Sequence, residues 1–201
     1  MLISIEGSTN NLSLALLKND LVISNETLNI KNELAQIIVP SISFLLKKNS
    51  ISINQLSAII VGCGPGSFTG IRTVIAAAKG IIFSNNNLQS IGVSGLAGLA
   101  MSVVDEALKN NIKYIISMID TKRDDVFLQL FKLNDQDKLL LPFRVMNQIE
   151  VFKIEQIQEY INKYNLSSKD ILFVGHKSSS INSNIFNVKI SESLSQYPKA
   201  I

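Results

Sequence analysis

Short runs of hydrophobic residues, interrupted by polar positions, fill the beginning of the chain. Leu2–Glu6 alternates between apolar and polar residues, Leu12–Leu17 is largely apolar, and Leu21–Leu28 follows a turn at Lys18-Asn19-Asp20. Short runs joined by tight connections are typical of neighbouring antiparallel strands. The pattern therefore predicts a three-stranded antiparallel meander at the N-terminus.

After Asn32 the spacing of the hydrophobic residues becomes longer than in the strands, and we expect Asn32 to cap a helix. Over Glu33–Lys47 the apolar positions recur every three or four residues, as they do along a helix. These positions are Leu34, Ile37, Ile38, Ile42, Leu45 and Leu46. Pro40 lies inside the segment and should bend it, because proline lacks a backbone donor and clashes with the preceding turn.

Strands and helices alternate in the middle of the chain. Ser57–Val61 and Leu88–Gly92 are predicted strands, while Gly70–Phe83 and Ser94–Leu108 are predicted helices, the second capped by Ser94. Strands separated by helices usually run parallel, whereas the N-terminal strands should run antiparallel. Together they predict an α/β fold with a mixed sheet and helices on its faces.

The composition changes near Lys109-Asn110-Asn111, where we place the boundary between an N-terminal domain, 1–109, and a smaller C-terminal α/β domain, 110–201. The predicted strands of the second domain are Lys113–Asp120, Val126–Leu133, Leu139–Val145 and Ile171–Val174, and its predicted helix is Glu155–Tyr164. Asn134–Asp137 should form the turn before the third strand. The serine-rich tail from Ser178 onward has no firm pattern.

The overall composition is that of a globular protein, with 46% hydrophobic residues. No segment resembles a signal peptide or a membrane span, so we expect a cytoplasmic protein. The net charge of +3 arises from 19 basic and 16 acidic residues without a dense basic patch. We therefore expect any contact with RNA to be shared with a partner.

The most informative segment joins a predicted strand to a predicted helix and reads Gly62-Cys63-Gly64-Pro65-Gly66-Ser67-Phe68-Thr69-Gly70-Ile71-Arg72. Two interpretations remain open. Backbone N–H groups near Ser67–Gly70 could cradle an anion at the start of the helix. Alternatively, the glycines could let the helix pack closely against the sheet. We favour the packing role, and the spacing fits neither a P-loop nor a dinucleotide-binding fingerprint.

Candidate catalytic groups are few. A charged turn contains Asp120, Lys122, Arg123, Asp124 and Asp125. It could be an acid–base group, but the mixed charges favour a solvated turn. His176 is the only histidine, and we expect it to have a surface or hydrogen-bonded role. Cys63 lacks a second cysteine for a disulfide and a nearby histidine for nucleophilic catalysis. We therefore expect no catalytic residue and no metal site.

Both predicted helices of the first domain are apolar around most of their circumference. One sheet cannot cover that much apolar surface, so we expect part of it to bind another subunit. The predicted interface consists of Leu34, Ile38, Ile42, Leu45, Arg72, Ile75, Lys79 and Ile82. An ordinary stable interface buries about 1,600 Å² in total.

The nonapeptide Gly-Pro-Gly-Ser-Phe-Thr-Gly-Ile-Arg, which begins at Gly64, resembles the signature of the bacterial TsaB (YeaZ) family. Ile91-Gly92-Val93-Ser94 and Ile119-Asp120 match further segments of TsaB-like proteins. The resemblance implies an actin/Hsp70/sugar-kinase-like (ribonuclease H-like) fold. That fold consists of two pseudo-repeated halves, and we expect the second half to be abbreviated.

TsaB-like proteins are understood to be noncatalytic paralogues of the TsaD enzyme, with which they pair to make the threonylcarbamoyl modification of adenosine-37 in tRNA. The resemblance implies a scaffold subunit without an intrinsic cofactor, in which ATP or ADP binds only at the interface of the complex. The implied partners are a TsaD-type catalytic paralogue, a TsaE-type ATPase and tRNA through the complex, with a homodimer when the chain is alone. TsaD carries a metal-binding histidine pair, and no histidine here precedes His176.

The resemblance also implies degenerate phosphate loops, because related enzymes place an acidic residue at the end of the first strand to support a metal-bound nucleotide. Here that residue is Glu6, where TsaB-like chains commonly carry aspartate. The residues of the implied loops are Glu6, Ser8, Thr9, Gly64, Gly66, Ser67, Thr69 and Gly70. An ordinary strand end with a polar turn is the competing interpretation of Glu6-Gly7-Ser8-Thr9, and we favour it.

The sequence departs from the family pattern at three places. Leu34 stands where a histidine is common, Lys122 replaces an arginine, and His176-Lys177 disrupts a Gly-x-Gly. A second hypothesis is a small ATP-dependent phosphotransferase or ATPase that uses Glu6, Thr9 and Gly66–Gly70. A peptidase-like activity is a weaker third, because the chain lacks a nucleophile–base pair.

Overall fold

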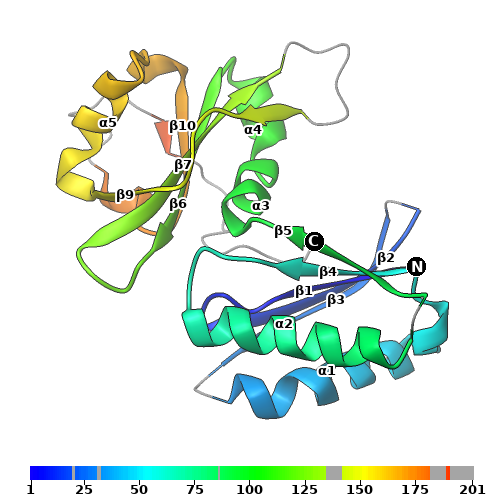
Figure 1. Ribbon diagram of the computed structural model, residues 1–201. Coiled ribbons are helices and arrows are strands. Elements are labelled where there is room, and N and C mark those ends of the chain that lie inside the picture. Colours follow the sequence, from blue (N-terminus) through cyan, green and yellow to red (C-terminus); the bar gives the residue numbers. More distant parts are fainter. Residues whose placement is uncertain (20, 31–32, 86, 135–141, 182–188, 191–201) are drawn as a thin grey trace. The chain divides into compact units, whose positions relative to one another are not determined.

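The computed structural model describes residues 1–19, 21–30, 33–85, 87–134, 142–181 and 189–190 (Figure 1). These residues form two compact units, a first unit that extends to Gly95 and a second unit that begins at Leu96. The division falls earlier in the chain than the boundary expected after residue 109. The reason is that Leu96, Leu99 and Ala107 belong to the hydrophobic core of the second unit.

The first unit contains a five-stranded mixed sheet in the order β3-β2-β1-β4-β5. Its strands are β1 (Leu2–Glu6), β2 (Asn11–Lys18), β3 (Leu21–Asn29), β4 (Ala58–Gly62) and β5 (Gln89–Val93). β1, β2 and β3 pair antiparallel, and β4 pairs parallel with both β1 and β5. The structure thus confirms the predicted meander and the parallel strands that follow it.

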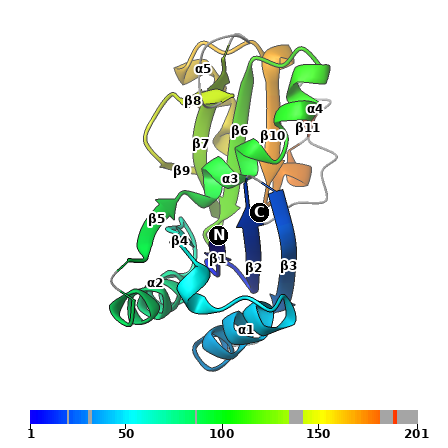
Figure 2. The same ribbon diagram turned by 90° about the vertical axis from the view of Figure 1, so that its right-hand side faces the viewer.

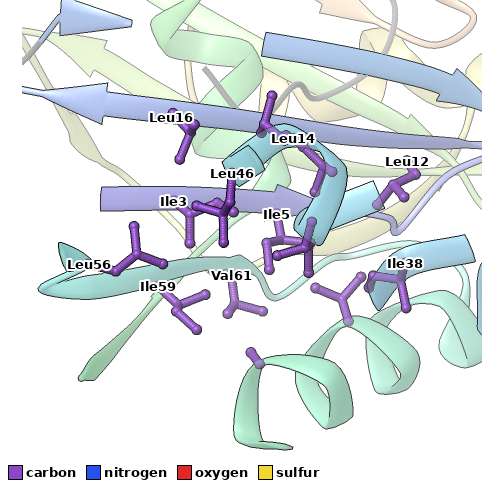
Figure 3. Close-up of a cluster of buried hydrophobic side chains, with 14 of the residues drawn as sticks. Ile3, Ile5, Leu12, Leu14, Leu16, Ile38, Leu46, Leu56, Ile59 and Val61 are labelled. Atoms are coloured by element: carbon purple, nitrogen blue, oxygen red, sulfur yellow. The ribbon is translucent and has the colours of Figure 1, made fainter. Parts of the chain in front are cut away.

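Two helices, α1 (Leu34–Lys48) and α2 (Phe68–Phe83), cover one face of this sheet (Figure 1). Alternate residues of the strands, including Ile3 and Ile5, meet Ile38 and Leu46 of α1 in a shared core (Figure 3). Because side chains alternate between the two faces of a strand, only every second residue contributes to this core. A 3₁₀ turn, η1 (Ile53–Gln55), follows α1.

The start of α1 differs from the prediction. Its N-cap is Glu33, whose side chain makes no capping hydrogen bond, and Asn32 lies outside the described residues. Pro40 lies within the helix, as the sequence indicated. The helix thus forms without a side-chain cap, and the burial of Ile38, Ile42, Leu45 and Leu46 is what ties it to the sheet.

The second unit contains a six-stranded sheet in the order β11-β10-β6-β7-β8, with β9 also paired to β7. Its strands are β6 (Tyr114–Asp120), β7 (Asp125–Leu133), β8 (Phe143–Val145), β9 (Glu150–Lys153), β10 (Ile171–Gly175) and β11 (Lys189–Ile190). Helices α3 (Gly95–Met101) and α4 (Val104–Lys109) pack on one face, and α5 (Ile157–Lys163) packs on the other. Burial on both faces explains why β10 is apolar at every position except its terminal glycine.

Several elements of the second unit differ from the prediction. The expected helix Ser94–Leu108 is broken after Met101, where the Ser102 hydroxyl donates to the Leu99 carbonyl. Such a local bond competes with the helical backbone pattern. The Ser94 hydroxyl has no hydrogen-bond partner among the described residues, so it does not cap α3.

Other elements of the second unit also begin or end at residues that differ from the prediction. The helix expected at Glu155–Tyr164 begins with the 3₁₀ turn η2 (Ile154–Gln156), and two further 3₁₀ turns, η3 (Ser168–Asp170) and η4 (Ser178–Ser180), flank β10. β9 and β11 were not predicted. Most of the turn expected at Asn134–Asp137 lies outside the described residues.

The two sheets repeat one pattern of strand pairing. In each, a first strand pairs antiparallel with the next strand in sequence and parallel with a later one, as β1 does with β2 and β4 and β6 does with β7 and β10. This repeat confirms the predicted actin-like α/β fold with two related halves. Within the described residues the second half is not abbreviated as expected, because its sheet has six strands against five in the first. No helix in the described ranges combines the length and the apolar character needed to cross a lipid bilayer.

Candidate functional site

The glycine-rich loop packs directly against the turn between β1 and β2. Ser67 donates its backbone N–H to the Ser8 carbonyl at 2.7 Å. Gly66 has a positive φ of 152°, and a Cβ there would lie 2.3 Å from the same carbonyl oxygen. Only glycine fits such an approach of two backbones. These contacts support the packing role that we favoured for the loop glycines.

The carboxylate of Glu6 is buried at the end of β1, against the neighbouring strand β4. Its Oε1 accepts the backbone N–H of Ser8 at 2.6 Å, and a Cβ on Gly62 would fall 1.9 Å from its Oε2. Burial raises the pKa of Glu6, and hydrogen bonds from Ser8 and Gly7 offset only part of this rise. Glu6 therefore serves as a buried strand-end acceptor, in keeping with the favoured interpretation of this turn.

Some backbone N–H groups at the start of α2 already donate hydrogen bonds within the chain. The Ser67 hydroxyl accepts the Gly70 N–H at 3.1 Å and so caps the helix, while the Ser67 N–H is held by Ser8. Two of the N–H groups expected to cradle an anion are therefore occupied within the protein.

A pocket of about 400 Å³ lies between the N-terminal ends of α1 and α2 in the first unit. It is lined by Gly7, Thr9, Asn10, Ile30, Leu34, Ala35, Ser67, Thr69, Gly70 and Thr73. It brings together Thr9, Ser67, Thr69 and Gly70 from the two predicted phosphate loops. Glu6, Ser8, Gly64 and Gly66 do not line it. The predicted loops therefore meet in space, but only half of their residues share a cavity.

The amino-acid sequence of the chain matches a known protein family. A family model described as TsaD, tRNA N6-adenosine threonylcarbamoyltransferase, matches residues 22–199. The tRNA threonylcarbamoyladenosine biosynthesis protein TsaB of Haemophilus influenzae is 33% identical over 101 residues, which are 48% of this chain and 41% of that protein. The protein of the same name from Bacillus subtilis is 24% identical over 182 residues, 89% of this chain and 72% of that protein. The chain belongs to the TsaB/YeaZ family.

The fold agrees with this assignment. YeaZ from Pseudomonas aeruginosa superposes with a TM-score of 0.75 at 23% identity, covering 99% of this chain and 86% of that one. The resemblance first drawn from the nonapeptide at Gly64 is thus confirmed. The aligned part of this TsaB-family chain spans less than half the length of the H. influenzae relative.

The predicted partner interface of this TsaB-family chain needs correction at three positions. Ile38, Ile42 and Leu45 are at most 3% exposed and belong to the core between α1 and the sheet. Leu34, Ile75 and Ile82 are half-buried against the same core, and Arg72 and Lys79 are exposed. The hydrophobic period identified the apolar positions of α1 and α2. Several of these positions pack against the sheet, so only those that point away from it are available to a partner.

The outward surface of α1 and α2 exposes apolar side chains that the prediction did not include. Val39 is 53% exposed, Phe44 57%, Phe68 72% and Phe83 91%. We call these four residues, together with Arg72, Lys79 and Gly80, the outer helix face. Arg72 lies over the Phe68 ring, 5.1 Å from its centroid. The sequence pattern did not single these residues out, because Val39 directly follows the buried Ile38 and Phe44 directly precedes the buried Leu45.

The charged turn of the second unit is built from local contacts. Lys177 pairs with Asp120 at 3.0 Å, and the Lys122 N–H donates to the same carboxylate at 3.0 Å. Partial burial acts to raise the pKa of Asp120, but these hydrogen bonds and the two cations hold it below its usual value. Thr121 donates its hydroxyl to the carboxylate of Asp125. These are the contacts of a structured turn.

His176 follows β10 and lies close to this turn. Burial, together with the positive charges of Lys122 and Lys177, lowers its pKa to about 4, although Asp120 acts in the opposite direction. Its imidazole is therefore neutral at pH 7. Within the ranges that the structure describes, no three histidine, cysteine, aspartate or glutamate residues are grouped to hold a metal ion.

Proposed function

We propose that this chain is a noncatalytic scaffold subunit that pairs with a TsaD-type enzyme and supports threonylcarbamoylation of adenosine-37 in tRNA. Membership of the TsaB/YeaZ family supports the pathway, since curated relatives are named as tRNA threonylcarbamoyladenosine biosynthesis proteins. The observation that carries the scaffold role is the outer helix face. Four large apolar side chains on two adjacent helices are exposed there.

The outer helix face has the composition of a binding surface. Exposed aromatic side chains such as Phe68 and Phe83 each gain roughly 1.5–3 kcal/mol when they are fully buried. Aromatic residues and arginine are also enriched among the residues that dominate binding energy. Arg72 and Lys79 at the edge would then select the partner by charge. The face can therefore hold a second subunit without help from the buried residues Ile38, Ile42 and Leu45.

Gly80 supports close approach of another helix. It lies within α2, where glycine costs about 1 kcal/mol relative to alanine. A Cβ at this position would have nothing within 4 Å, so packing inside this chain does not require glycine. A partner helix that crosses α2 at Gly80 would make use of the missing side chain.

The remaining parts of the proposal follow from this pairing. The chain acts in the cytoplasm, and it needs no cofactor of its own, while ATP or ADP would bind at the junction with the catalytic subunit. A TsaE-type ATPase and tRNA would join the pair. The lack of a second histidine supports a noncatalytic role, because His176 alone cannot supply a metal-binding pair.

The test is complex formation with the TsaD-type paralogue, measured by size-exclusion chromatography with light scattering. Val39→Asp and Phe83→Asp should abolish the complex, because each places a charge in the apolar contact. Val151→Asp is the matched control, since Val151 of β9 is also 53% exposed but lies in the other unit. A complex that survives both helix variants would overturn the proposal.

Titration calorimetry with ATP and magnesium separates the scaffold from the alternative phosphotransferase. A scaffold should bind nucleotide weakly or not at all when it is alone. Tight binding by the isolated chain, followed by turnover, would favour the enzyme instead.

A further inference from the structure

A row of three side chains crosses one end of the second sheet, and two of them carry the same charge. Tyr114 of β6 is directly opposite Lys132 of β7, and Lys132 is directly opposite Arg144 of β8. Figure 2 shows these strands side by side. Residues directly opposite in an antiparallel pair lie on the same face, with Cβ atoms about 4.5–5.5 Å apart. The row therefore presents an aromatic ring and two cations on one face.

The two cations of this row are not neutralised by any carboxylate in the described ranges. Lys132 and Arg144 take part in none of the ion pairs found there, whereas Lys113, next to Tyr114, pairs with Asp170 at 3.0 Å. Lys132 instead lies with its Nζ 6.0 Å from the centroid of the Tyr114 ring. Like charges directly opposite each other destabilise a sheet. The fold therefore retains an unfavourable pair that nothing else in the described residues requires.

The row also lies where a ligand can reach it. Helix α5 covers the neighbouring part of this face, where Tyr160 and Ile161 pack against Ile116 and Leu130. At the row itself Arg144 is exposed and Lys132 and Tyr114 are half-buried. Both cations are thus accessible at paired strand positions.

We propose that Tyr114, Lys132 and Arg144 form a contact site for the phosphate backbone of an RNA. A phosphate between the two cations would remove their repulsion, and guanidinium groups bind phosphate oxygens in a bidentate manner. The adjacent tyrosine ring offers a surface on which a base can stack. This inference rests on the proposed role in tRNA modification and adds a direct contact by this subunit.

Arg144→Glu is the decisive variant, because it should move stability and binding in opposite directions. A glutamate opposite Lys132 replaces a like-charge pair with an opposite-charge pair, so Tm should rise. Affinity of the full chain for a transcribed tRNA with adenosine at position 37 should fall about fivefold to tenfold at low salt. The slope of log K against log salt should decrease in magnitude by about 1. Fluorescence anisotropy measures both binding quantities.

Arg72→Glu is the matched control for net charge. Each substitution removes two units of charge from a total of +3, which leaves +1 (3 − 2 = 1). Arg72 belongs to the outer helix face, so its substitution should weaken the complex with the TsaD-type paralogue but hardly affect tRNA binding. Arg144→Glu should do the reverse. A failed scaffold proposal is thus distinguishable from a failed RNA site.

Several results would overturn the RNA site. Equal losses of tRNA affinity in both variants would mean that only net charge matters, and unchanged affinity in Arg144→Glu would exclude the row. A lower Tm of that variant would mean that a carboxylate already neutralises Arg144. Vesicles of phosphatidylglycerol serve as a second anionic probe. If they bind through Arg144 and tRNA does not, the ligand is a lipid surface instead.

Discussion

The α-carbon of Gly70, in the first turn of α2, faces the carbonyl oxygen of Gly7 so closely that a Cβ would lie 2.2 Å from that oxygen. Backbone on both sides leaves no side chain that could move aside. Gly70→Ala should therefore destabilise the first unit by about 2 kcal/mol or more, a typical cost of overpacking.

Gly80 of the same helix is the natural control, because nothing lies within 4 Å of its would-be Cβ. Gly80→Ala should stabilise the chain by about 0.5–1 kcal/mol through improved helix propensity. Urea denaturation monitored by circular dichroism gives both values. Equal effects of the two substitutions would show that the close approach at Gly70 is not structurally important.

The neighbouring residues Ile38 and Val39 should respond very differently to the same substitution. Ile38 is 2% exposed in the core beneath α1, while Val39 is 53% exposed on the outer helix face. Ile38→Asp buries a charge without a partner and should unfold the first unit, at a cost of about 3 kcal/mol or more. Val39→Asp should fold normally and fail only in partner binding. Thermal unfolding separates the two, and a well-folded Ile38→Asp protein would contradict the observed packing.

This pair shows what the hydrophobic pattern could and could not reveal. The period of α1 and α2 identified the helices correctly, but both are apolar around most of their surface. For such helices the period does not say which side meets the sheet, so Ile38, Ile42 and Leu45 were assigned to a partner. The short apolar runs of β1 and β2 were easier to interpret, because their length and the turn residues between them are typical of strands.

The features missed in the second unit have local causes. The break near Ser102 depends on one hydroxyl bond to the Leu99 carbonyl, which leaves no mark on hydrophobicity. β9 was missed because Val151 is exposed although it lies in the strand, which removes the usual contrast between buried and exposed positions. The glycine-rich sequence suggested close approaches at Gly62, Gly66 and Gly70. Their partners, at the end of β1 for Gly62 and in the β1–β2 turn for the other two, required the structure.

His176 should make the protein less stable as the pH falls from about 6.5 toward 4. Its pKa in the folded state is about 4, whereas the ordinary value is 6.5, so between these values the unfolded chain binds more protons. Stability therefore rises with pH in this window and is fully present above it. His176→Gln should show a smaller loss of stability between pH 7 and pH 4.5, measured by urea midpoints. Parallel pH profiles for the two proteins would rule out the histidine as the cause.

Asn147 joins β7, the loop before β9 and α5, and its removal should destabilise the second unit. Its Oδ1 accepts the Leu130 N–H at 2.9 Å, and its Nδ2 lies 2.8 Å from Glu150 Oε1 and 3.0 Å from the Tyr160 hydroxyl. Tyr160 is fully buried, and burial raises the pKa of its hydroxyl well above the ordinary value.

Asn147→Ala would leave the Leu130 N–H without its acceptor, at an expected cost of about 2–4 kcal/mol for the network. Asn162→Ala is the matched control, because the exposed Asn162 side chain accepts a single hydrogen bond, from Gln158, and its loss should cost less than about 0.5 kcal/mol. Chemical denaturation measures both, and hydrogen exchange at Leu130 reports the lost bond directly. If Leu130 remains as protected in Asn147→Ala as in the unaltered chain, the side chain does not hold β7 to the loop.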